Sequence, residues 1–563
     1  MNNLTFKKPL LSIFNQYGAI VCISFLLVAC GKKEAPPKAV DAATPAAQTE
    51  QSVFKVLATS DLRDAQPLEA MVEKATGVKL KFSFGGTMES TEQVLSGKTD
   101  ADGAWFANAK YLLSDPAGQA RVKLQEKIML SPIVVGVSES VVAELGWTDA
   151  SKVTWKSVTT AANSGKLRYA LSNPATSNQG YTALMGVVAA ASNKSEALVA
   201  ADVDRGAIAG FLKGYRLVGD NSTYLSEKFY EQQGAQVNAF INYESWLLSM
   251  NQSGKLREPL KLFYPKEGIS TADYPMMLLN DQRRDDYSKI VAYLKGDEAQ
   301  TWLAKTTLRR PVNPEVVKAV TSLFPQGEML VELPFSPDRA LADGLIDAYL
   351  NEFRRPIAST FVLDTSGSMN GGTRRQDLIQ ALHYVAGADA SLTGRLARLT
   401  SRERVWMLPF SETPRPATYF ELPIAAATKG VQLQADSQAK REVLDKVRDY
   451  ATNLNMQGGT ALYDAVLAAL QNMTAERLKK PNYQYSVVAF TDGENNKGRD
   501  LAEFKAAYAA LPEDVKGIPV FMVLFGEAKE SDLKELVKIT GGRVFDARKA
   551  GLAAVFKDIR AYQ

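Results

Sequence analysis

Residues 357–369 of this chain read IASTFVLDTSGSM, an apolar run that ends in an aspartate and then in small hydroxyl residues. Residues 357–363 are a candidate strand, because residues 358–363 form an apolar run. The polar residues that follow come at the carboxyl end of this strand. In open α/β sheets, ligands bind outside the carboxyl ends of the strands. This stretch therefore predicts an open α/β domain over the last third of the chain.

Strand and helix signals alternate through the rest of this region. Expected strands are 357–363, 405–410, 485–490, 520–525 and 543–546, and expected helices are 377–388, 440–454, 461–474, 501–508, 531–539 and 550–562. One parallel sheet in a doubly wound α/β domain over residues 357–563 accounts for this order. There are two further polar loops. Residues 458–462 lie just before an expected helix, and residues 491–494 directly follow an expected strand. All three loops are expected to meet where the strand order reverses.

These three loops carry oxygen ligands. The carboxylates are Asp364 and Asp492, and the hydroxyls are Ser366, Ser368 and Thr460. Such a set suits a hard octahedral cation, Mg²⁺ first, with Mn²⁺ or Ca²⁺ as alternatives. Two acids leave a dication site near neutral charge, so the site can accept a further carboxylate from outside.

The same five residues resemble the metal-ion-dependent adhesion site of the von Willebrand factor A (VWA) domain, DxSxS…T…D, over about residues 354–563. The resemblance implies that Ser366, Ser368 and Thr460 act at or near the metal, and that Asp364 and Asp492 act through water. It also implies a protein partner whose acidic residue completes the metal shell. Each motif alone has a simpler reading, since Asp-x-Ser-x-Ser often caps a helix and Thr-Asp-Gly often forms a turn. Their order and strand context favour the metal site.

Residues 53–339 have a second α/β pattern. Strands are expected at 53–59 and 78–84, a helix at 68–75, and a strand buried on both faces at 127–137. About 290 residues of this alternation predict parallel sheets in two lobes. A break near 334–337 precedes an apolar helical stripe that includes Leu341 and Leu345, which predicts a connecting helix within residues 340–356. Pro356 ends it, because proline disfavours helix in the residue before it.

The layout of residues 53–335 resembles the type 2 periplasmic solute-binding fold, with a ligand cleft between two lobes. The resemblance rests on polar turns after apolar strands and on the loop 172–181 ahead of an apolar helix. Candidate ligand-binding residues are Ser60, Asp61, Gly86, Thr87, Ser177, Asn178 and Tyr243. Free N–H groups at helix N-termini suit anions. The alternative is that each of these residues is only a turn or a cap.

The N-terminus is typical of a bacterial lipoprotein precursor. Lys7 and Lys8 precede a short apolar core at 19–29, as in a secretory signal peptide. Residues 27–31, LVACG, resemble the lipobox, which implies a lipid on Cys30, a signal peptide over 1–30 and membrane attachment. Residues 31–52 are poor in large apolar side chains and are expected to form a flexible tether. An aspartate is not present at position 31, which slightly favours the outer membrane of the cell envelope.

Other functional classes are disfavoured. The formal net charge is +4, and it falls to +2 without residues 1–30, so nucleic acid is not an expected partner. His383 is the only histidine, and both cysteines lie within the first 30 residues, which leaves no Cys/His zinc cluster or Cys–His pair. We therefore expect no enzyme. The expected function is metal-bridged capture of a protein partner. The alternative is a solute receptor for transport or sensing whose VWA domain docks the next component.

Overall fold

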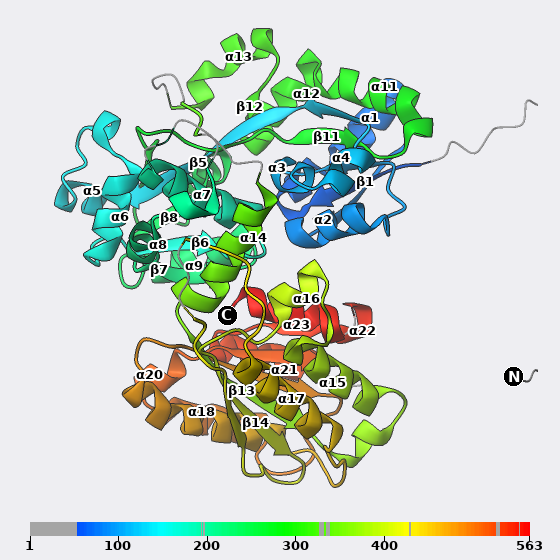
Figure 1. The fold of residues 1–563 in the computed structure, drawn as a ribbon, viewed down its shortest axis with the longest axis vertical. Helices are drawn as coiled ribbons and strands as arrows, with labels where there is room; N and C mark the ends of the chain where they lie inside the picture. The colour runs from blue at the N-terminus through cyan, green and yellow to red at the C-terminus, as the bar shows by residue number, and fades with distance from the viewer. Residues whose placement is uncertain are drawn as a thin grey trace, which may run out of the picture. The chain divides into compact units, whose positions relative to one another are not determined.

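The computed structural model describes residues 53–563 except 193, 195–197, 326–330, 334–337, 427–429, 525–529 and 551. The predicted signal peptide, the tether, Cys30 and the predicted break at 334–337 lie outside the described residues. Residues 51–563 form one unit by their contacts. Figure 1 shows its three α/β parts: the first combines blue and green segments because the chain returns to it, and the third extends to the red C-terminus.

The first part, lobe 1, is a sheet in the order β2-β1-β3-β11-β4. Its strands are β1 (Phe54–Thr59), β2 (Leu80–Gly85), β3 (Gly103–Trp105), β4 (Leu124–Lys127) and β11 (Pro275–Leu278). Its helices are α1 (Leu68–Thr76), α2 (Thr87–Ser96), α3 (Lys110–Leu113), α4 (Pro116–Arg121) and α11 (Arg284–Leu294), and α12 (Asp297–Trp302) and α13 (Pro314–Val320) follow α11. Strands β1, β2 and β3 are parallel, whereas β11 is antiparallel to both neighbours.

The second part, lobe 2, is a sheet in the order β10-β5-β8-β6-β7, with β9 and β12 also paired to β5. Its strands are β5 (Met129–Ser138), β6 (Tyr169–Ser172), β7 (Tyr215–Gly219), β8 (Ala239–Tyr243), β9 (Leu260–Phe263), β10 (Thr271–Ala272) and β12 (Arg310–Pro311). Its helices are α5 (Glu139–Glu144), α6 (Trp155–Asn163), α7 (Asn178–Ser192), α8 (Arg205–Leu212), α9 (Ser222–Gln232) and α10 (Glu244–Gln252).

The expectation of purely parallel sheets is wrong for both lobes. The chain crosses between lobes from β4 to β5 and returns from β10 to β11. The predicted apolar strand is the buried β5, and its neighbours β8, β9, β10 and β12 all run antiparallel to it. The apolar sequence predicted that β5 is buried, but it did not predict the direction of the neighbouring strands. Tyr274, within the returning connection, has a left-handed φ of 41°.

The third part is a sheet in the order β15-β14-β13-β16-β17-β18. Its strands are β13 (Ile357–Asp364), β14 (Arg404–Phe410), β15 (Thr418–Glu421), β16 (Gln484–Thr491), β17 (Val520–Leu524) and β18 (Val544–Asp546). Its helices are α15 (Arg374–His383), α16 (Leu392–Ala397), α17 (Gln438–Thr452), α18 (Leu462–Lys479), α19 (Leu501–Ala509), α20 (Glu513–Lys516), α21 (Glu530–Thr540), α22 (Ala547–Ala550) and α23 (Leu552–Ala561). All predicted strands are present. The sheet is not wholly parallel, because the mostly exposed edge strand β15 runs antiparallel to β14.

Strand β13 explains why this sheet has helices on both faces. Its successive side chains point to opposite faces. Phe361 and Leu363 belong to the core under α15, α17 and α23, whereas Ala358 and Val362 belong to the core under α18, α19 and α21. Every residue of β13 is buried.

Helix α14 (Arg339–Ala348) connects the second and third parts, as predicted, and continues as a π-helix over Tyr349–Phe353. Asp338 caps the helix by accepting a hydrogen bond from the backbone N–H of Ala340. Leu341 and Leu345 are fully buried, so an apolar stripe of the helix packs into the core.

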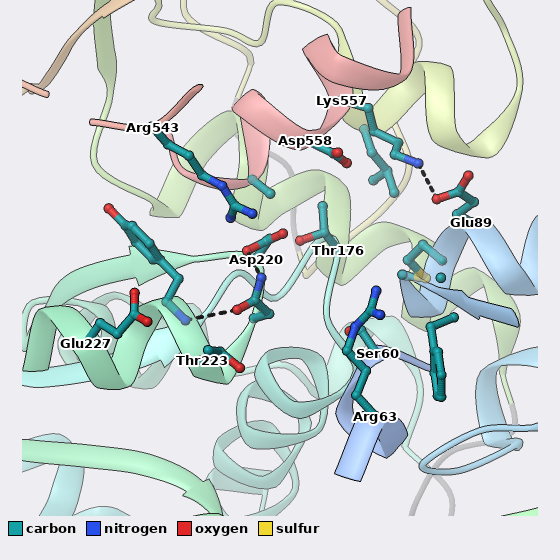
Figure 2. A pocket seen from close by; sticks show the side chains of 18 of the residues that line it. Ser60, Arg63, Glu89, Thr176, Asp220, Thr223, Glu227, Arg543, Lys557 and Asp558 are labelled. Carbon is teal, nitrogen blue, oxygen red and sulfur yellow. Dashed lines mark hydrogen bonds and ion pairs between the residues drawn. The ribbon is translucent and has the colours of Figure 1, made fainter. Parts of the chain in front are cut away.

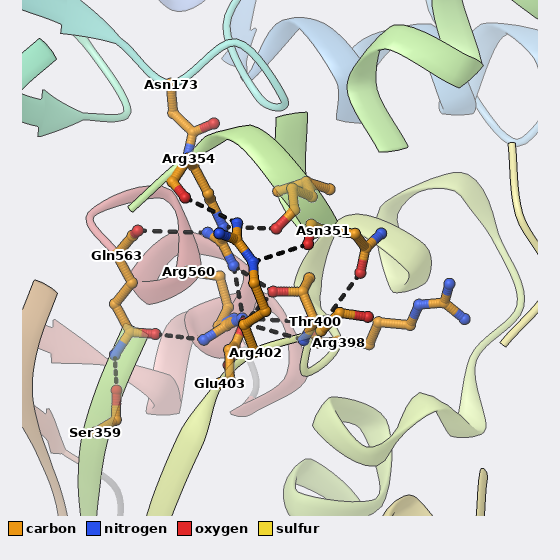
Figure 3. A network of polar contacts seen from close by, with 12 residues as sticks. Asn173, Asn351, Arg354, Ser359, Arg398, Thr400, Arg402, Glu403, Arg560 and Gln563 are labelled. Atoms are coloured by element: carbon orange, nitrogen blue, oxygen red, sulfur yellow. Dashed lines mark hydrogen bonds and ion pairs between the residues drawn. The ribbon is translucent and has the colours of Figure 1, made fainter. Parts of the chain in front are cut away.

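A buried charge cluster lies at the start of β13 (Figure 3). The carboxylate of Glu403 accepts hydrogen bonds from Arg354 (Nη2 to Oε1, 2.8 Å), from the backbone N–H of Thr400 (3.0 Å) and from Arg560. Burial acts to raise the pKa of Glu403, but Arg560 and Arg354 outweigh it and lower the pKa below its usual value. Burial also lowers the pKa of Arg354, to about 10. The cluster ties the connecting segment to β14 and α23.

Candidate functional site

The five predicted metal ligands lie together at the carboxyl ends of β13 and β16. Ser368 Oγ lies 2.9 Å from Ser366 Oγ and donates a hydrogen bond to Asp492 Oδ1 at 2.9 Å. Thr460 lies in the loop before α18. Its hydroxyl and that of Ser368 both lie near Gly493, because a Cβ added at this glycine would lie 3.8 Å from Ser368 Oγ and 4.0 Å from Thr460 Oγ1. Sequence order alone put these residues about 130 positions apart. Parallel pairing of β13 with β16 brings them together.

Hydrogen bonds hold the two carboxylates in place. Asp364 accepts from the backbone N–H of Ser366 and from Thr491 Oγ1, each at 2.9 Å. Burial raises the pKa of Asp364 to about 6, and the nearby Asp492 acts in the same direction. Both acids are at most 1% exposed, whereas Ser368 is exposed. The pocket of oxygens is thus open to solvent on its Ser368 side.

The backbone around the oxygens is also fixed. The N–H of Gly367 bonds to the carbonyl of Gly458 (2.8 Å), and the N–H of Gln457 bonds to the carbonyl of Thr365 (2.7 Å). Gly458 has a φ of 84°, the left-handed region that favours glycine. The side chain of Asn496 accepts from the backbone N–H of Thr460 at 2.9 Å. The three loops therefore support one another without a ligand.

Arg374 is a site residue that the motif did not identify. It lies at the start of α15 and donates from Nη1 to Asp492 Oδ2 (2.9 Å) and to the carbonyl of Ser368 (3.2 Å). Its charge offsets that of one acid. The only signal for it in the sequence was a pair of basic residues, Arg374 and Arg375, six and seven positions after Ser368.

The donor set fits a hard divalent cation. It consists of two carboxylates and three hydroxyls, with no thiolate or imidazole. Among the described residues, no group of three or more His, Cys, Asp or Glu side chains forms an alternative metal cluster. The oxygens of Asp364 accept hydrogen bonds from Ser366 and Thr491. A carboxylate oxygen has two lone pairs, so these hydrogen bonds leave lone pairs that can bind a cation.

All seven candidate solute residues line one small recess between the lobes. The recess, about 50 Å³, is also lined by Thr176, Gln179, Trp246 and the stretch 220–223, which sequence reasoning missed. The missed stretch follows strand β7 and opens α9, the same strand-to-helix pattern that pointed to the other turns.

The chemistry of the recess is mixed. Helix α2 begins at Thr87, and no side chain caps its first N–H groups, which leaves donors for an anionic group. Burial raises the pKa of Asp61 above its usual value, although the positive charge of Arg309 acts in the opposite direction. Arg309 is 2% exposed and donates to Asp64 Oδ2 at 2.7 Å. The recess thus offers donors, hydroxyls and one acid to a polar solute.

A two-lobed binding region joined to a doubly wound domain with an oxygen-rich site defines a binding protein in two parts. Residues 55–309 match the family of bacterial extracellular solute-binding proteins, and residues 360–558 match the von Willebrand factor type A domain. Both resemblances seen in the sequence are confirmed, as is the α/β fold class. No curated protein matches the chain significantly.

Solved structures also match part of this chain. One is the sulfate-binding protein SubI from Mycobacterium tuberculosis H37Rv, with 16% identity, a TM-score of 0.38, and coverage of 50% of this chain and 94% of that one. Another is the periplasmic binding protein AfuA from Actinobacillus pleuropneumoniae, with fructose-6-phosphate bound, with 14% identity, a TM-score of 0.41, and coverage of 54% and 98%. At this likeness neither ligand is carried over to this chain.

A solute-binding domain and a VWA domain together fit a binding or docking role. Solute-binding proteins bind their ligands without transforming them, which points away from catalysis. The extracellular family points to the periplasm or the cell exterior. Across the part of the chain that the structure describes, no helix combines the length and the apolarity needed to cross a membrane.

Proposed function

We propose that this chain is an extracytoplasmic binding protein whose VWA domain captures an acidic side chain of a protein partner through a divalent cation. The observation that carries the proposal is the meeting of Ser366, Ser368 and Asp492 within hydrogen-bonding distance at one edge of the sheet. With Asp364 and Thr460, these side chains would hold Mg²⁺, or alternatively Mn²⁺ or Ca²⁺.

A bound cation would supply positive charge for an incoming carboxylate. The protein's own part is to keep the oxygens in place and one side open. The hydrogen bonds to Asp364 orient that carboxylate, and the exposure of Ser368 leaves room for a partner. Removal of the cation with EDTA should abolish capture as fully as loss of a ligand does. Capture that persists in EDTA would count against this function.

The recess favours a second candidate function, a receptor for a small solute. All seven predicted residues line it, and the uncapped start of α2 supports an anionic group on the solute. Asp61 and the hydroxyls supply further polar contacts. The VWA domain would then dock the next component of a transport or sensing system.

A screen of the full chain against oxyanions, sugar phosphates, sugars and amino acids is expected to find a solute that raises the unfolding temperature. A ligand at about 100 times its Kd adds about 2.7 kcal/mol to stability. The control is Gly86→Tyr. No atom lies within 4 Å of the position of a Cβ at Gly86, so the substitution should fold normally and obstruct the recess. A shift that persists in this variant would place the solute elsewhere.

Membrane attachment through a lipid on Cys30 completes the proposal, with the outer membrane favoured. A single acyl chain binds membranes only marginally, but two or three anchor stably. We expect the wild-type chain to fractionate with membranes, and the Cys30→Ser chain to appear in the soluble fraction of the envelope. Membrane association of the variant at the wild-type level would exclude the lipid as the anchor.

A further inference from the structure

A cavity of about 810 Å³ lies at the mouth of the solute recess, and three parts of the chain wall it (Figure 2). Lobe 1 contributes Arg63, lobe 2 contributes Asp220, and the VWA domain contributes Arg543 and Lys557. The cavity shares Gly86 and Asp220 with the recess, so the two spaces adjoin. The VWA domain therefore contacts both lobes at the place where a solute would enter.

The contacts of the VWA domain with helix α2 of lobe 1 are polar and charged. Lys557 Nζ pairs with Glu89 Oε2 at 2.6 Å. The carboxylate of Glu92 accepts from the backbone N–H groups of Leu392 (3.2 Å) and Thr393 (3.1 Å), at the start of α16. The Glu89 side chain is 41% exposed. Charge contacts of this kind are weak and are screened by salt.

Its contacts with lobe 2 are more buried. The rings of Tyr224 and Tyr562 meet edge to face with centroids 4.6 Å apart. The side chain of Asn173, 1% exposed, donates to the carbonyl of Ala561 at 3.3 Å. Edge-to-face aromatic pairs gain energy beyond the area they bury, and salt does not screen them. The direct contacts of the VWA domain with α2 are thus easier to release than its contacts with lobe 2. The connecting helix α14 also reaches lobe 1, where Asp343 accepts a hydrogen bond from Tyr111 at 2.8 Å.

Helix α2 serves the recess and the VWA contact at once. Its first residue, Thr87, lines the recess, and Glu89 and Glu92 follow within the next two turns. A helix rises about 1.5 Å per residue, so the two sets of contacts lie within about 8 Å along its axis. Two-lobed binding proteins close around their ligands by hinge motion. The connections between the lobes include the crossings from β4 to β5 and from β10 to β11, and the later passage from α11 to β12.

We propose that the VWA domain bridges the mouth of the cleft and sets the separation of the two lobes. It stays on lobe 2 and holds lobe 1 through Glu89 and Glu92 of α2. Closure on a solute at the start of α2 must then move or break these contacts, so solute binding and VWA docking are coupled. The coupling is reciprocal by thermodynamic linkage. The solute side of this coupling rests on the proposed receptor function, whereas the bridge itself does not.

Distances between spin labels on the full chain test the bridge without solute or metal. Both cysteines, Cys22 and Cys30, are replaced by serine, and labels are placed at Lys74→Cys in lobe 1 and Lys213→Cys in lobe 2. Both lysines are exposed on their lobes. Double electron–electron resonance then reports the separation of the lobes. One narrow distance is expected for the otherwise native chain.

Removing the bridge to lobe 1 is expected to change that distance. Glu89→Ala with Glu92→Ala should broaden the distribution or add a second distance, and 1 M salt, with a Debye length of about 3 Å, should act in the same direction. Hydrogen exchange at the amides of Leu392 and Thr393 should speed up. The charge-matched control is Glu73→Ala with Glu144→Ala, two exposed acids of lobes 1 and 2.

A charge swap distinguishes loss of the Lys557–Glu89 ion pair from a general loss of acidic charge. Lys557→Glu alone should widen the lobe distance, and adding Glu89→Lys should restore it, because the ion pair is then rebuilt with the opposite sense. Unchanged lobe distances in the double-alanine variant would overturn the bridge. Because neither solute nor cation is present, this outcome is independent of whether metal capture or solute binding fails.

Discussion

The chain with Asp364→Ala is expected to lose divalent-cation binding by at least about 100-fold, and with it the capture of any acidic partner. Substitution of residues that only support metal ligands already costs about 10- to 100-fold in affinity. Asp364 supplies one of the two carboxylates and also fixes Ser366 and Thr491. Calorimetric titration of the full chain with Mn²⁺ and Mg²⁺ measures the loss.

Two further variants make this result specific to the site. Asp364→Asn keeps one acceptor oxygen, for the N–H of Ser366, and presents its NH₂ group to Thr491 Oγ1, which can accept a hydrogen bond. The charge is removed, so binding should fall while the fold is retained. Asp377→Ala removes a nearby acid on α15 that accepts a hydrogen bond from Thr373 Oγ1 at 2.7 Å and is not one of the five predicted metal ligands. It should bind as wild type. Cation affinity in Asp364→Ala that equals that of Asp377→Ala would exclude the site.

Arg374→Gln tests the same site in the opposite direction. The guanidinium of Arg374 holds Asp492 Oδ2 and brings positive charge beside the position of a cation. Two unit charges about 4 Å apart interact by about 1 kcal/mol even in bulk water, and a dication doubles this. We therefore expect tighter cation binding by about tenfold. Weaker binding would show that Arg374 supports the oxygens rather than opposing the cation.

The second large effect concerns the buried charge cluster. Glu403→Ala is expected to destabilise the folded chain by about 3–5 kcal/mol, the usual cost of leaving buried charges without their partner. Arg354 and Arg560, 5% and 3% exposed, would both lose their carboxylate. Urea unfolding measures the change. It is followed by far-UV circular dichroism and by tryptophan fluorescence, to which Trp406 of β14 contributes.

Glu421→Ala is the matched control for this prediction. Glu421 also pairs with an arginine of β14, Arg404, at 3.0 Å, but it is 49% exposed. Its loss should cost no more than about 1 kcal/mol, as for other surface pairs. Replacing Arg354, Glu403 and Arg560 together with apolar residues of similar size should cost far less than Glu403→Ala alone. Equal effects of Glu403→Ala and Glu421→Ala would contradict the argument from burial.

Much of the fold could be predicted from local patterns. The run that became β13 is buried on both faces, so its apolar residues are continuous, and the polar loop at 364–369 marks the point where burial ends. The stripe of Leu341 and Leu345 predicted α14 in the same way. The directions of β11, β5 and β15 could not be predicted, because an apolar run specifies burial and not the strand beside it.

The sequence by itself determined which side chains could hold a cation or a solute, since chemistry and order along the chain were enough to select them. Only the tertiary structure decided what surrounds them. Arg374 reaches Asp492 because the parallel pairing of β13 with β16 brings the segment after β13 to the end of β16. Glu403 contacts two arginines from segments about 50 and 160 positions away. The VWA residues that line the cavity, such as Arg543 and Lys557, also reach it only through tertiary packing. A long-range charge pair produces no periodic pattern in the sequence. The residues around one partner do not depend on the identity or position of the other partner.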